Sequence, residues 1–338
     1  MKTWGILVGL ITLAVIAGAP GCGSKSSSNN SNNTNNNGGN NNGSGTQKIS
    51  NYTVGSRPVG IAIDASGDIW VADSGGSTVS EIITSTSKTV SITVAAPPWG
   101  IAIDQDGNVW VSEPSAGNIQ EISGTTAQPA QNIGGSPYGI AVDSQGVIWC
   151  TDTKNNQIWD SNDGTWTAGA GTAVAGRIID QGGQNIWYDA VSSGKGELYT
   201  TLATQTPLLT NSPTGMGVDQ NGNLWVADST GYVESVVGSG YDVHVGGKPM
   251  GIAVDQGYNA WVADNTGNVV EINQLLAVAN SYHVGGSPEG IAIDSNGNVW
   301  VTNSGGNTVT RLAGVAPDGP YWPYSGAGYA VFPGGGNW

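Results

Sequence analysis

Tryptophan recurs at a nearly constant interval along most of this chain of 338 residues. The steps between the recurring residues are 40, 39, 38, 38, 36 and 39. The residues are Trp70, Trp110, Trp149, Trp187, Trp225, Trp261 and Trp300. A fixed period of this length indicates a repeat architecture, in which each unit buries its apolar faces against its neighbours. The sequence therefore predicts seven copies of one unit.

Each copy is typical of short β-strands joined by tight turns. The copy at residues 287–303 reads Ser-Pro-Glu-Gly-Ile-Ala-Ile-Asp-Ser-Asn-Gly-Asn-Val-Trp-Val-Thr-Asn, so β-branched runs alternate with Gly-Asn turns. A fourth strand is expected at residues 281–284, before the next Pro-x-Gly. Four strands per period predict an all-β fold, a seven-bladed β-propeller of four-stranded blades. The fourth copy, at residues 175–180, departs most from the others.

An N-terminal strand is expected to close the ring. Residues 49–55 resemble the fourth strand of a unit but precede the first Pro-x-Gly, at Pro58. Pairing with the last unit would remove the open sheet edges. The Trp strands are apolar on both faces, so we assign these Trp side chains to the packing between blades. We place the propeller at 47–312 and an aromatic, Gly-rich tail at 313–338, which packs across one face or hangs free.

The N-terminus indicates export. Residues 1–21 have the pattern of a signal peptide, with Lys2 before an apolar run and small residues at its end. The sequence Ala-Pro-Gly-Cys ending at Cys22 resembles a bacterial lipobox, which predicts lipidation of Cys22; plain secretory cleavage is the alternative. Residues 22–46 contain mostly Ser, Asn and Gly and are expected to form a disordered tether. We expect anchoring to the cell envelope, at the outer membrane or cell surface, or otherwise a secreted or periplasmic protein.

The charge balance restricts the partners. The chain has 10 Lys and Arg against 25 Asp and Glu, a net charge of −15. Nucleic acid and anionic lipid are poor partners for such a surface, so membrane contact is expected only through the lipid anchor. Apart from Cys22 the chain has one cysteine, Cys150, so no disulfide is expected within a monomer.

Acidic residues recur at the third position after the repeated Trp. They are Asp73, Glu113, Asp152, Asp228 and Asp264. If these side chains converged, they could hold Ca²⁺ or Mg²⁺, the only cofactors that the sequence suggests. Recurrence in successive copies favours the other interpretation, in which each carboxylate accepts hydrogen bonds from the turn that follows it. The Asp that ends each Ile-Ala-Ile-Asp segment is interpreted in the same way.

Departures from the repeat consensus mark a candidate ligand face. Trp99, Tyr138, Glu113 and Glu289 depart most clearly, and Asp152 lies among them. The first three belong to adjacent copies and should share one rim, where aromatic rings beside a carboxylate would suit a sugar or a cationic peptide. The alternative is that Trp99 and Tyr138 fill the central channel or pack under the tail.

The repeat Pro-x-Gly-Ile-Ala-Ile-Asp-x-x-Gly-Asn-Val-Trp-Val-Ala-Asp resembles NHL repeats and the related virginiamycin B lyase (streptogramin lyase) propellers, over residues 49–312. The resemblance implies a magnesium-assisted site on one face, with His and Glu near the x of Pro-x-Gly. No His stands at these positions, which are Val59, Trp99, Tyr138, Ala175, Thr214, Met250 and Glu289. His244 and His283 fall instead in the expected outer strands, where solvated roles are favoured. Streptogramin elimination is therefore not expected.

These observations favour a surface-anchored propeller that binds a protein, peptide or glycan through its face. No catalytic residue is assigned. The alternative is a metal-assisted lyase or lactonase, built from Glu113, Asp152 and Glu289.

Overall fold

The computed structural model describes residues 48–162, 164–167, 173–180, 186–192, 195–200, 208–210, 213–219, 221–235 and 241–316. All of them belong to one compact unit, Thr46–Trp338. They contain strands and no helix, and therefore no helix that could cross a membrane. The proposed signal peptide, Cys22, the tether and residues 317–338 of the tail lie outside the described residues.

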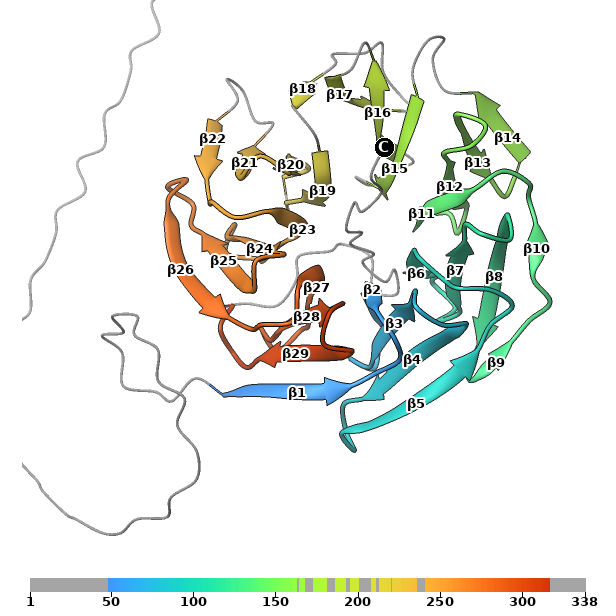
Figure 1. Cartoon of the computed structure of the whole chain (residues 1–338), viewed down its shortest axis with the longest axis horizontal. Helices are drawn as coiled ribbons and strands as arrows, with labels where there is room; N and C mark the ends of the chain where they lie inside the picture. The colour runs from blue at the N-terminus through green and yellow to red at the C-terminus, as the bar shows by residue number, and fades with distance from the viewer. Residues whose placement is uncertain are drawn as a thin grey trace, which may run out of the picture. The chain divides into compact units, whose positions relative to one another are not determined.

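The strands form sheets arranged around a common centre, as in a β-propeller (Figure 1). We number the sheets in chain order. Sheet 1 contains β2 (Pro58–Ile63), β3 (Ile69–Asp73), β4 (Thr78–Ile83) and β5 (Lys88–Thr93). Sheet 2 contains β6 (Ile101–Ile103), β7 (Val109–Glu113), β8 (Asn118–Ser123), β9 (Thr126–Ala127) and β10 (Gln131–Asn132). Sheet 3 contains β11 (Pro137–Val142), β12 (Ile148–Asp152), β13 (Gln157–Asp160) and β14 (Gly164–Thr167).

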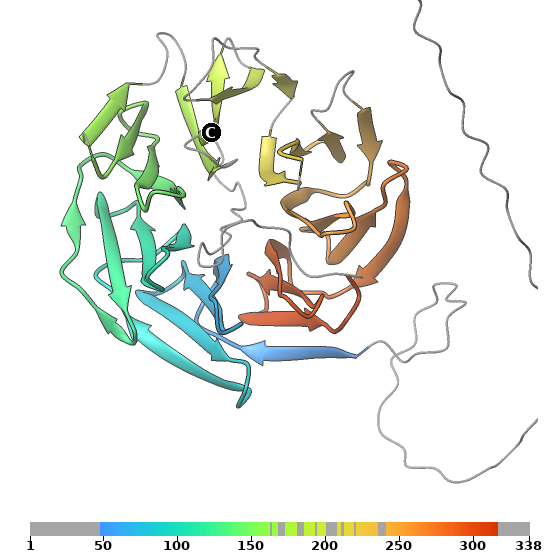
Figure 2. The ribbon, with the colours of Figure 1, turned by 180° about the vertical axis from the view of Figure 1, so that it is seen from behind.

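The remaining sheets follow the same order from the centre outward (Figure 2). Sheet 4 contains β15 (Ala173–Asp180), β16 (Ile186–Ser192), β17 (Lys195–Thr200) and β18 (Leu208–Thr210). Sheet 5 contains β19 (Pro213–Val218), β20 (Leu224–Asp228), β21 (Tyr232–Ser235) and β22 (Tyr241–His244). Sheet 6 contains β23 (Pro249–Val254), β24 (Ala260–Asp264), β25 (Asn268–Ile272) and β26 (Val278–His283).

Sheet 7 closes the ring with both ends of the described chain. It contains β27 (Pro288–Ile293), β28 (Val299–Asn303), β29 (Thr308–Leu312) and the N-terminal β1 (Ile49–Thr53). Strand β1 is antiparallel to β29, with Ile49 opposite Leu312 and Thr53 opposite Thr308. The predicted closure by an N-terminal strand is therefore confirmed. Six of the sheets consist of strands that are consecutive in the chain, and only this one combines distant segments.

The expectation of four strands in every blade is wrong for sheet 2, which has five. The segment after β8 is divided: β9 pairs with the end of β8, opposite Ile122 and Ser123, and β10 pairs with its beginning, opposite Asn118 and Ile119. Pro129 stands between the two short strands. Proline has no N–H to donate to the ladder, so a continuous fourth strand is interrupted there.

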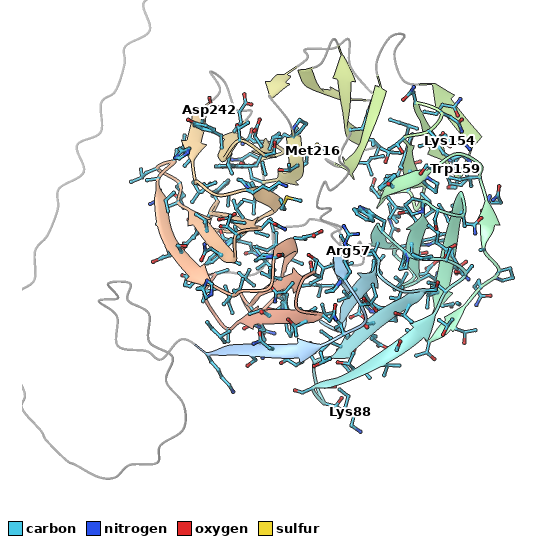
Figure 3. The ribbon with its side chains drawn as sticks, in the orientation of Figure 1. Arg57, Lys88, Lys154, Trp159, Met216 and Asp242 are labelled. Carbon is cyan, nitrogen blue, oxygen red and sulfur yellow. The ribbon has the colours of Figure 1, made fainter. Side chains whose placement is uncertain are left out.

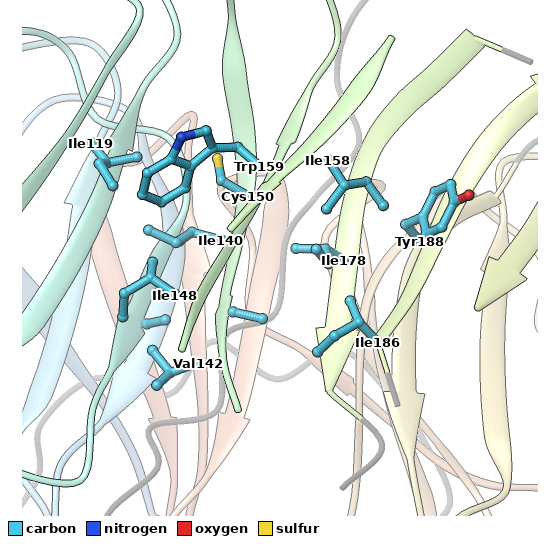
Figure 4. Close-up of a cluster of buried hydrophobic side chains, with 12 residues drawn as sticks. Ile119, Ile140, Val142, Ile148, Cys150, Ile158, Trp159, Ile178, Ile186 and Tyr188 are labelled. Atoms are coloured by element: carbon cyan, nitrogen blue, oxygen red, sulfur yellow. The ribbon is translucent and has the colours of Figure 1, made fainter. Parts of the chain in front are cut away.

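The core lies between neighbouring sheets, as the apolar Trp strands predicted. One cluster joins Ile119 of sheet 2, Ile140 and Cys150 of sheet 3, and Ile178 and Tyr188 of sheet 4 (Figure 4). Every one of these residues is at most 2 % exposed. The inner strands also approach closely, because a Cβ atom placed on Gly60 would lie 2.7 Å from the carbonyl oxygen of Trp99 in the next sheet. The Gly of Pro-x-Gly is needed for this approach.

Candidate ligand-binding face

One edge of the ring carries both sets of predicted site positions. The Pro of Pro-x-Gly begins an inner strand, and the third residue after Trp ends the strand beside it. The two are opposite each other in the antiparallel ladder at Pro58 and Asp73, Pro137 and Asp152, Pro213 and Asp228, Pro249 and Asp264, and Pro288 and Asn303. We call this edge the Pro-x-Gly face.

The acids at the third position after Trp are buried and bound to local donors. The five residues Asp73, Glu113, Asp152, Asp228 and Asp264 are between 0 and 5 % exposed. Asp264 accepts hydrogen bonds from the backbone N–H groups of Lys248 (2.7 Å) and Thr266 (3.0 Å). Asp152 accepts from Ser136 N (2.8 Å) and from the following turn at Asn155 Nδ2 (2.6 Å). These bonds confirm the interpretation as turn caps for Asp152 and Asp264, whereas Asp73 accepts from the hydroxyls of Thr78 and Ser80 on the next strand.

No metal site assembles from these acids in the part of the chain that the structure describes, where no group of three or more His, Cys, Asp or Glu side chains is spaced to hold an ion. Each carboxylate serves its own blade. The Glu113 carboxylate, for example, accepts from Ala96 N (3.0 Å) through Oε1 and from Asn118 Nδ2 (3.1 Å) through Oε2. The structure therefore does not present Glu113 as a free acid beside Trp99.

In five of the sheets, the Asp at the end of the inner strand has a second role that sequence reasoning did not identify. Asp294, for example, accepts from Asn296 N and Asn298 N through Oδ1, as a turn cap should. Its Oδ2 accepts from the indole Nε1 of Trp300 at 2.8 Å. The same bond joins Trp70 to Asp64, Trp110 to Asp104, Trp149 to Asp143 and Trp261 to Asp255. The constant spacing of six residues between this Asp and the repeated Trp could have indicated the hydrogen bond from the sequence.

The x positions differ in exposure. Val59, Thr214, Met250 and Glu289 are buried, at 0, 4, 3 and 7 % exposed. Trp99 and Tyr138 are only partly buried, and their rings meet edge to face with centroids 5.4 Å apart. The side chain of Ala175 lies outside the described residues. The structure therefore brings the two predicted aromatics together on the Pro-x-Gly face, and both remain partly accessible.

A hydroxyl in the neighbouring sheet fixes the backbone at Tyr138. Ser112, the second residue after Trp110, accepts from Gly100 N (2.9 Å) and donates to the carbonyl oxygen of Tyr138. Thr302 does the same in sheet 7, accepting from Gly290 N (2.8 Å) and donating to the carbonyl oxygen of Val59 (2.9 Å). These bonds hold adjacent inner strands in register and so position the x residues.

Arg57 is a further member of this group that the sequence reasoning missed. Its guanidinium carbon lies 5.4 Å from the centroid of the Trp99 ring, a cation–π contact. The side chain is exposed and lies toward the centre of the ring (Figure 3). Ser stands before the Pro at positions 136, 212 and 287, so Arg57 and Lys248 were detectable departures from the repeat.

Glu289 stands at the x position of sheet 7, and its carboxyl is buried. Its Oε1 accepts from Ser304 Oγ at 2.6 Å, while its Oε2 is buried without a hydrogen-bond partner among the described residues. Burial raises the pKa of this carboxyl, and Ser304, Arg57 and Lys248 act in the opposite direction.

The two histidines lie where the sequence placed them, in the outermost strands β22 and β26, and both are exposed. The His244 ring contacts Tyr232 at 4.8 Å between centroids, and His283 Nδ1 lies 3.3 Å from Asn268 Oδ1. The imidazoles are thus on the rim, away from the inner strands. Cys150 is a buried free thiol whose pKa is raised well above its ordinary value, mainly by burial.

Comparison with known proteins supports the repeat assignment and the fold. The NHL repeat family matches residues 56–81 and 286–312. No curated protein matches the sequence. Among solved structures, virginiamycin B lyase from Staphylococcus aureus is 18 % identical with a TM-score of 0.68, over 79 % of this chain and 99 % of that chain.

Two other similar structures have different roles. A gluconolactonase from Xanthomonas campestris is 16 % identical with a TM-score of 0.52, over 80 % of this chain and 90 % of that one. BBS1N, in complex with ARL6DN, is 11 % identical with a TM-score of 0.63, over 78 % of this chain and 95 % of that one. Enzymes and a protein-binding propeller therefore share this fold. The chain carries NHL repeats and has a β-propeller fold similar to that of virginiamycin B lyase.

Proposed function

We propose that this chain is an exported propeller, anchored to the cell envelope through a lipid on Cys22, that binds a protein, peptide or glycan partner through the Pro-x-Gly face. The observation that carries the proposal is the contact of Trp99 with Tyr138 and Arg57. Trp99 and Tyr138 are partly exposed at an x position where four other copies have buried residues. Partly exposed aromatic rings beside a charged group favour a ligand-binding surface.

The surrounding chemistry supports binding over metal-assisted catalysis. The acids that could have held Mg²⁺ or Ca²⁺ cap turns, and the histidines lie on the outer strands. A general base must lie within reach of the substrate proton that it removes. Glu289 is the only acid of the proposed catalytic trio with a free buried oxygen, since Glu113 is satisfied at both oxygens and Asp152 accepts bonds from its own turn.

The test is ligand-induced stabilisation of the full chain against a panel of glycans and peptides, measured as the shift in melting temperature. A ligand that binds only the folded state raises this temperature by mass action. Trp99→Ala and Tyr138→Ala should each abolish the shift. Tyr258→Ala is the matched control, because Tyr258 follows Asp255 in a turn at the opposite edge of the ring.

Two results would contradict the proposal. A ligand whose stabilisation survives both face substitutions binds elsewhere on the protein. Turnover of a lactone or a streptogramin that is lost in Glu289→Gln would make the chain an enzyme of the kind that its structural relatives include.

A further inference from the structure

The aromatic pair of the Pro-x-Gly face carries two polar atoms that are open to a ligand. Neither Nε1 of Trp99 nor the hydroxyl of Tyr138 has a hydrogen-bond partner among the described residues. Neither atom is buried, in contrast to the unpaired Nε1 of Trp225. Five of the repeated Trp side chains instead donate to an Asp of their own sheet. A ligand on these two rings can therefore accept hydrogen bonds from both of them.

The carboxylates of the same face are not open to a ligand. Glu113 belongs to the same sheet as Trp99, and its two oxygens accept from Ala96 N and Asn118 Nδ2. Sugar hydroxyls donate as well as accept hydrogen bonds, so a sugar site needs accessible acceptors. The acids of this face are at most 7 % exposed: Asp73, Glu113, Asp152, Asp228, Asp264 and Glu289. The surroundings of Trp99 therefore suit a ligand that accepts hydrogen bonds and donates few.

Arg57 makes a cationic ligand a poor occupant of this site. Its guanidinium carbon lies 5.4 Å from the centroid of the Trp99 ring, so the indole already has a cation–π partner within the chain. The guanidinium forms no hydrogen bond with a described residue, and the side chain is exposed. Its N–H groups can therefore donate to a ligand beside those of Trp99 and Tyr138.

The aromatic pair is fixed before a ligand binds. The two ring planes meet at 70° with centroids 5.4 Å apart, so they form a corner of two apolar surfaces. Trp99 N donates to Ser112 O at 2.8 Å, and Ala96 N donates to Glu113 Oε1 at 3.0 Å, so the segment before the indole is held at both ends. The Ser112 hydroxyl also donates to the carbonyl oxygen of Tyr138. Such preorganisation lowers the entropy cost of binding and favours a rigid apolar group as the occupant.

We propose that the Pro-x-Gly face binds a proline-rich segment of a partner protein in the polyproline II conformation. A proline ring packs into the corner between Trp99 and Tyr138, and carbonyl oxygens of the segment accept from Trp99 Nε1, the Tyr138 hydroxyl and the Arg57 guanidinium. Proline has no backbone N–H, so a run of prolines presents acceptors without donors. A polyproline II helix is rigid and has no internal hydrogen bonds, and aromatic surfaces are its usual binding sites. This inference rests on the proposed binding function and names the class of partner.

The test is titration calorimetry of the full chain with decaproline that is capped at both ends, and with the D-proline peptide of the same length. The mirror-image peptide has the same composition and carbonyl groups but forms a helix of the opposite hand. Decaproline should bind at least about 10-fold more tightly than the D-proline peptide, the factor that one lost hydrogen bond accounts for.

Conservative variants test the donors. Trp99→Phe and Tyr138→Phe each keep an aromatic ring and remove one donor, so each should weaken decaproline binding about 5- to 10-fold. Arg57→Met keeps a long apolar side chain without donors and should weaken binding by a similar factor. Tyr232→Phe is the matched control, because Tyr232 is 42 % exposed and contacts His244 in sheet 5. This variant should bind decaproline like the parent chain, and all four should melt like it.

Equal affinity for the two peptides, or unchanged affinity in both Trp99→Phe and Tyr138→Phe, would overturn the polyproline site. Cellohexaose, a neutral sugar, would show a glycan site instead if it bound more tightly than decaproline and lost affinity in the same variants. In either case the binding function itself stands if some ligand still loses its stabilisation in Trp99→Ala and Tyr138→Ala, and it falls only if none does.

Discussion

At the scale of single residues, the third position after the repeated Trp accepts either a charged Asp or a neutral Asn. In sheet 1, Asp73 Oδ2 accepts from Thr78 Oγ1 (3.0 Å) and Ser80 Oγ (2.8 Å). In sheet 7, the equivalent Asn303 donates through Nδ2 to Thr308 Oγ1 (3.3 Å) and Thr310 Oγ1 (2.7 Å). Hydroxyl groups donate or accept as required, so they pair with either side chain.

This comparison predicts a pH-dependent effect of Asp73→Asn. Burial is the main cause that raises the pKa of Asp73 from 3.8 to about 6. The folded state therefore holds this proton more tightly than the unfolded state, and its contribution to stability is present below pH 3.8 and declines as pH rises to about 6. The loss amounts to about 3 kcal/mol at neutral pH. Asp73→Asn should remove that decline and stabilise the protein at pH 7, as measured by urea unfolding between pH 3.5 and 8.

Asp264→Asn is the control for that experiment. The Asp264 carboxylate accepts two backbone N–H groups, which a neutral amide binds less strongly. This variant should be destabilised at pH 7. Destabilisation of Asp73→Asn to the same extent would show that the two positions are equivalent and that the burial argument is wrong.

The indole hydrogen bond can be tested at two matched tryptophans. Trp261 is fully buried and donates to Asp255 Oδ2 at 2.9 Å. Trp225 occupies the same position in sheet 5, is 4 % exposed, and its Nε1 has no hydrogen-bond partner within the described ranges of the chain. Both Phe substitutions remove similar packing, but only Trp261→Phe breaks a hydrogen bond. Trp261→Phe should cost about 1–2 kcal/mol more in unfolding free energy than Trp225→Phe; equal losses would mean that the bond adds nothing.

At the scale of elements, closure of the ring depends on a single short strand. Strand β1 covers the edge of β29, and Tyr52 lies against Trp300 with ring centroids 5.3 Å apart. Thr310 Oγ1 also donates to Asn51 Oδ1 at 2.7 Å. Without β1, the edge of β29 would be free to pair with another molecule.

Two truncated proteins whose N-termini differ by eight residues should therefore differ in melting temperature and in oligomeric state. A chain beginning at residue 47 keeps β1, whereas a chain beginning at residue 55 lacks it. The shorter chain should melt about 5–15 °C lower, because it loses several kcal/mol of pairing and packing. It should also form higher oligomers, which light scattering would detect. Identical melting and a monomeric state would mean that β1 does not hold the ring closed.

At the scale of the whole molecule, the acids are distributed among blades rather than gathered at one centre. Each satisfies the loops of its own repeat, as Asp152 and Asp264 do through backbone donors on both sides. Stability should therefore not depend on a divalent ion.

This expectation is checked by the melting temperature of the full chain in EDTA, then with added Mg²⁺ or Ca²⁺. The curves should agree within about 1 °C, because an ion without a site cannot stabilise the folded state by mass action. A rise of several degrees that EDTA reverses would show a site for the ion and would favour the lyase or lactonase alternative.

The sequence by itself determined the strand order within most repeats, because every copy carries the same local signals. The spaced Trp, the turn dipeptides and the alternating apolar runs predicted the strand order within each unit, the closing role of β1 and the capping role of Asp152 and Asp264. These features are set by residues close in the chain or in the adjacent copy. The same sequence signals therefore predict the same structure in each repeat. The fifth strand of sheet 2 was missed because Pro129 interrupts a pairing that the remaining copies keep.

Only the tertiary structure decided which polar side chains have all their hydrogen bonds satisfied. Glu113 and Glu289 looked alike in the sequence, yet the first has both oxygens paired with its own loop and the second has one buried oxygen without a donor. The Arg57 guanidinium joins sheet 1 to Trp99 of sheet 2, and the Thr302 hydroxyl joins sheet 7 to the carbonyl oxygen of Val59 in sheet 1. Residues more than 200 positions apart become neighbours only when the ring closes. Local sequence patterns predict strands and turns but not contacts between such distant residues.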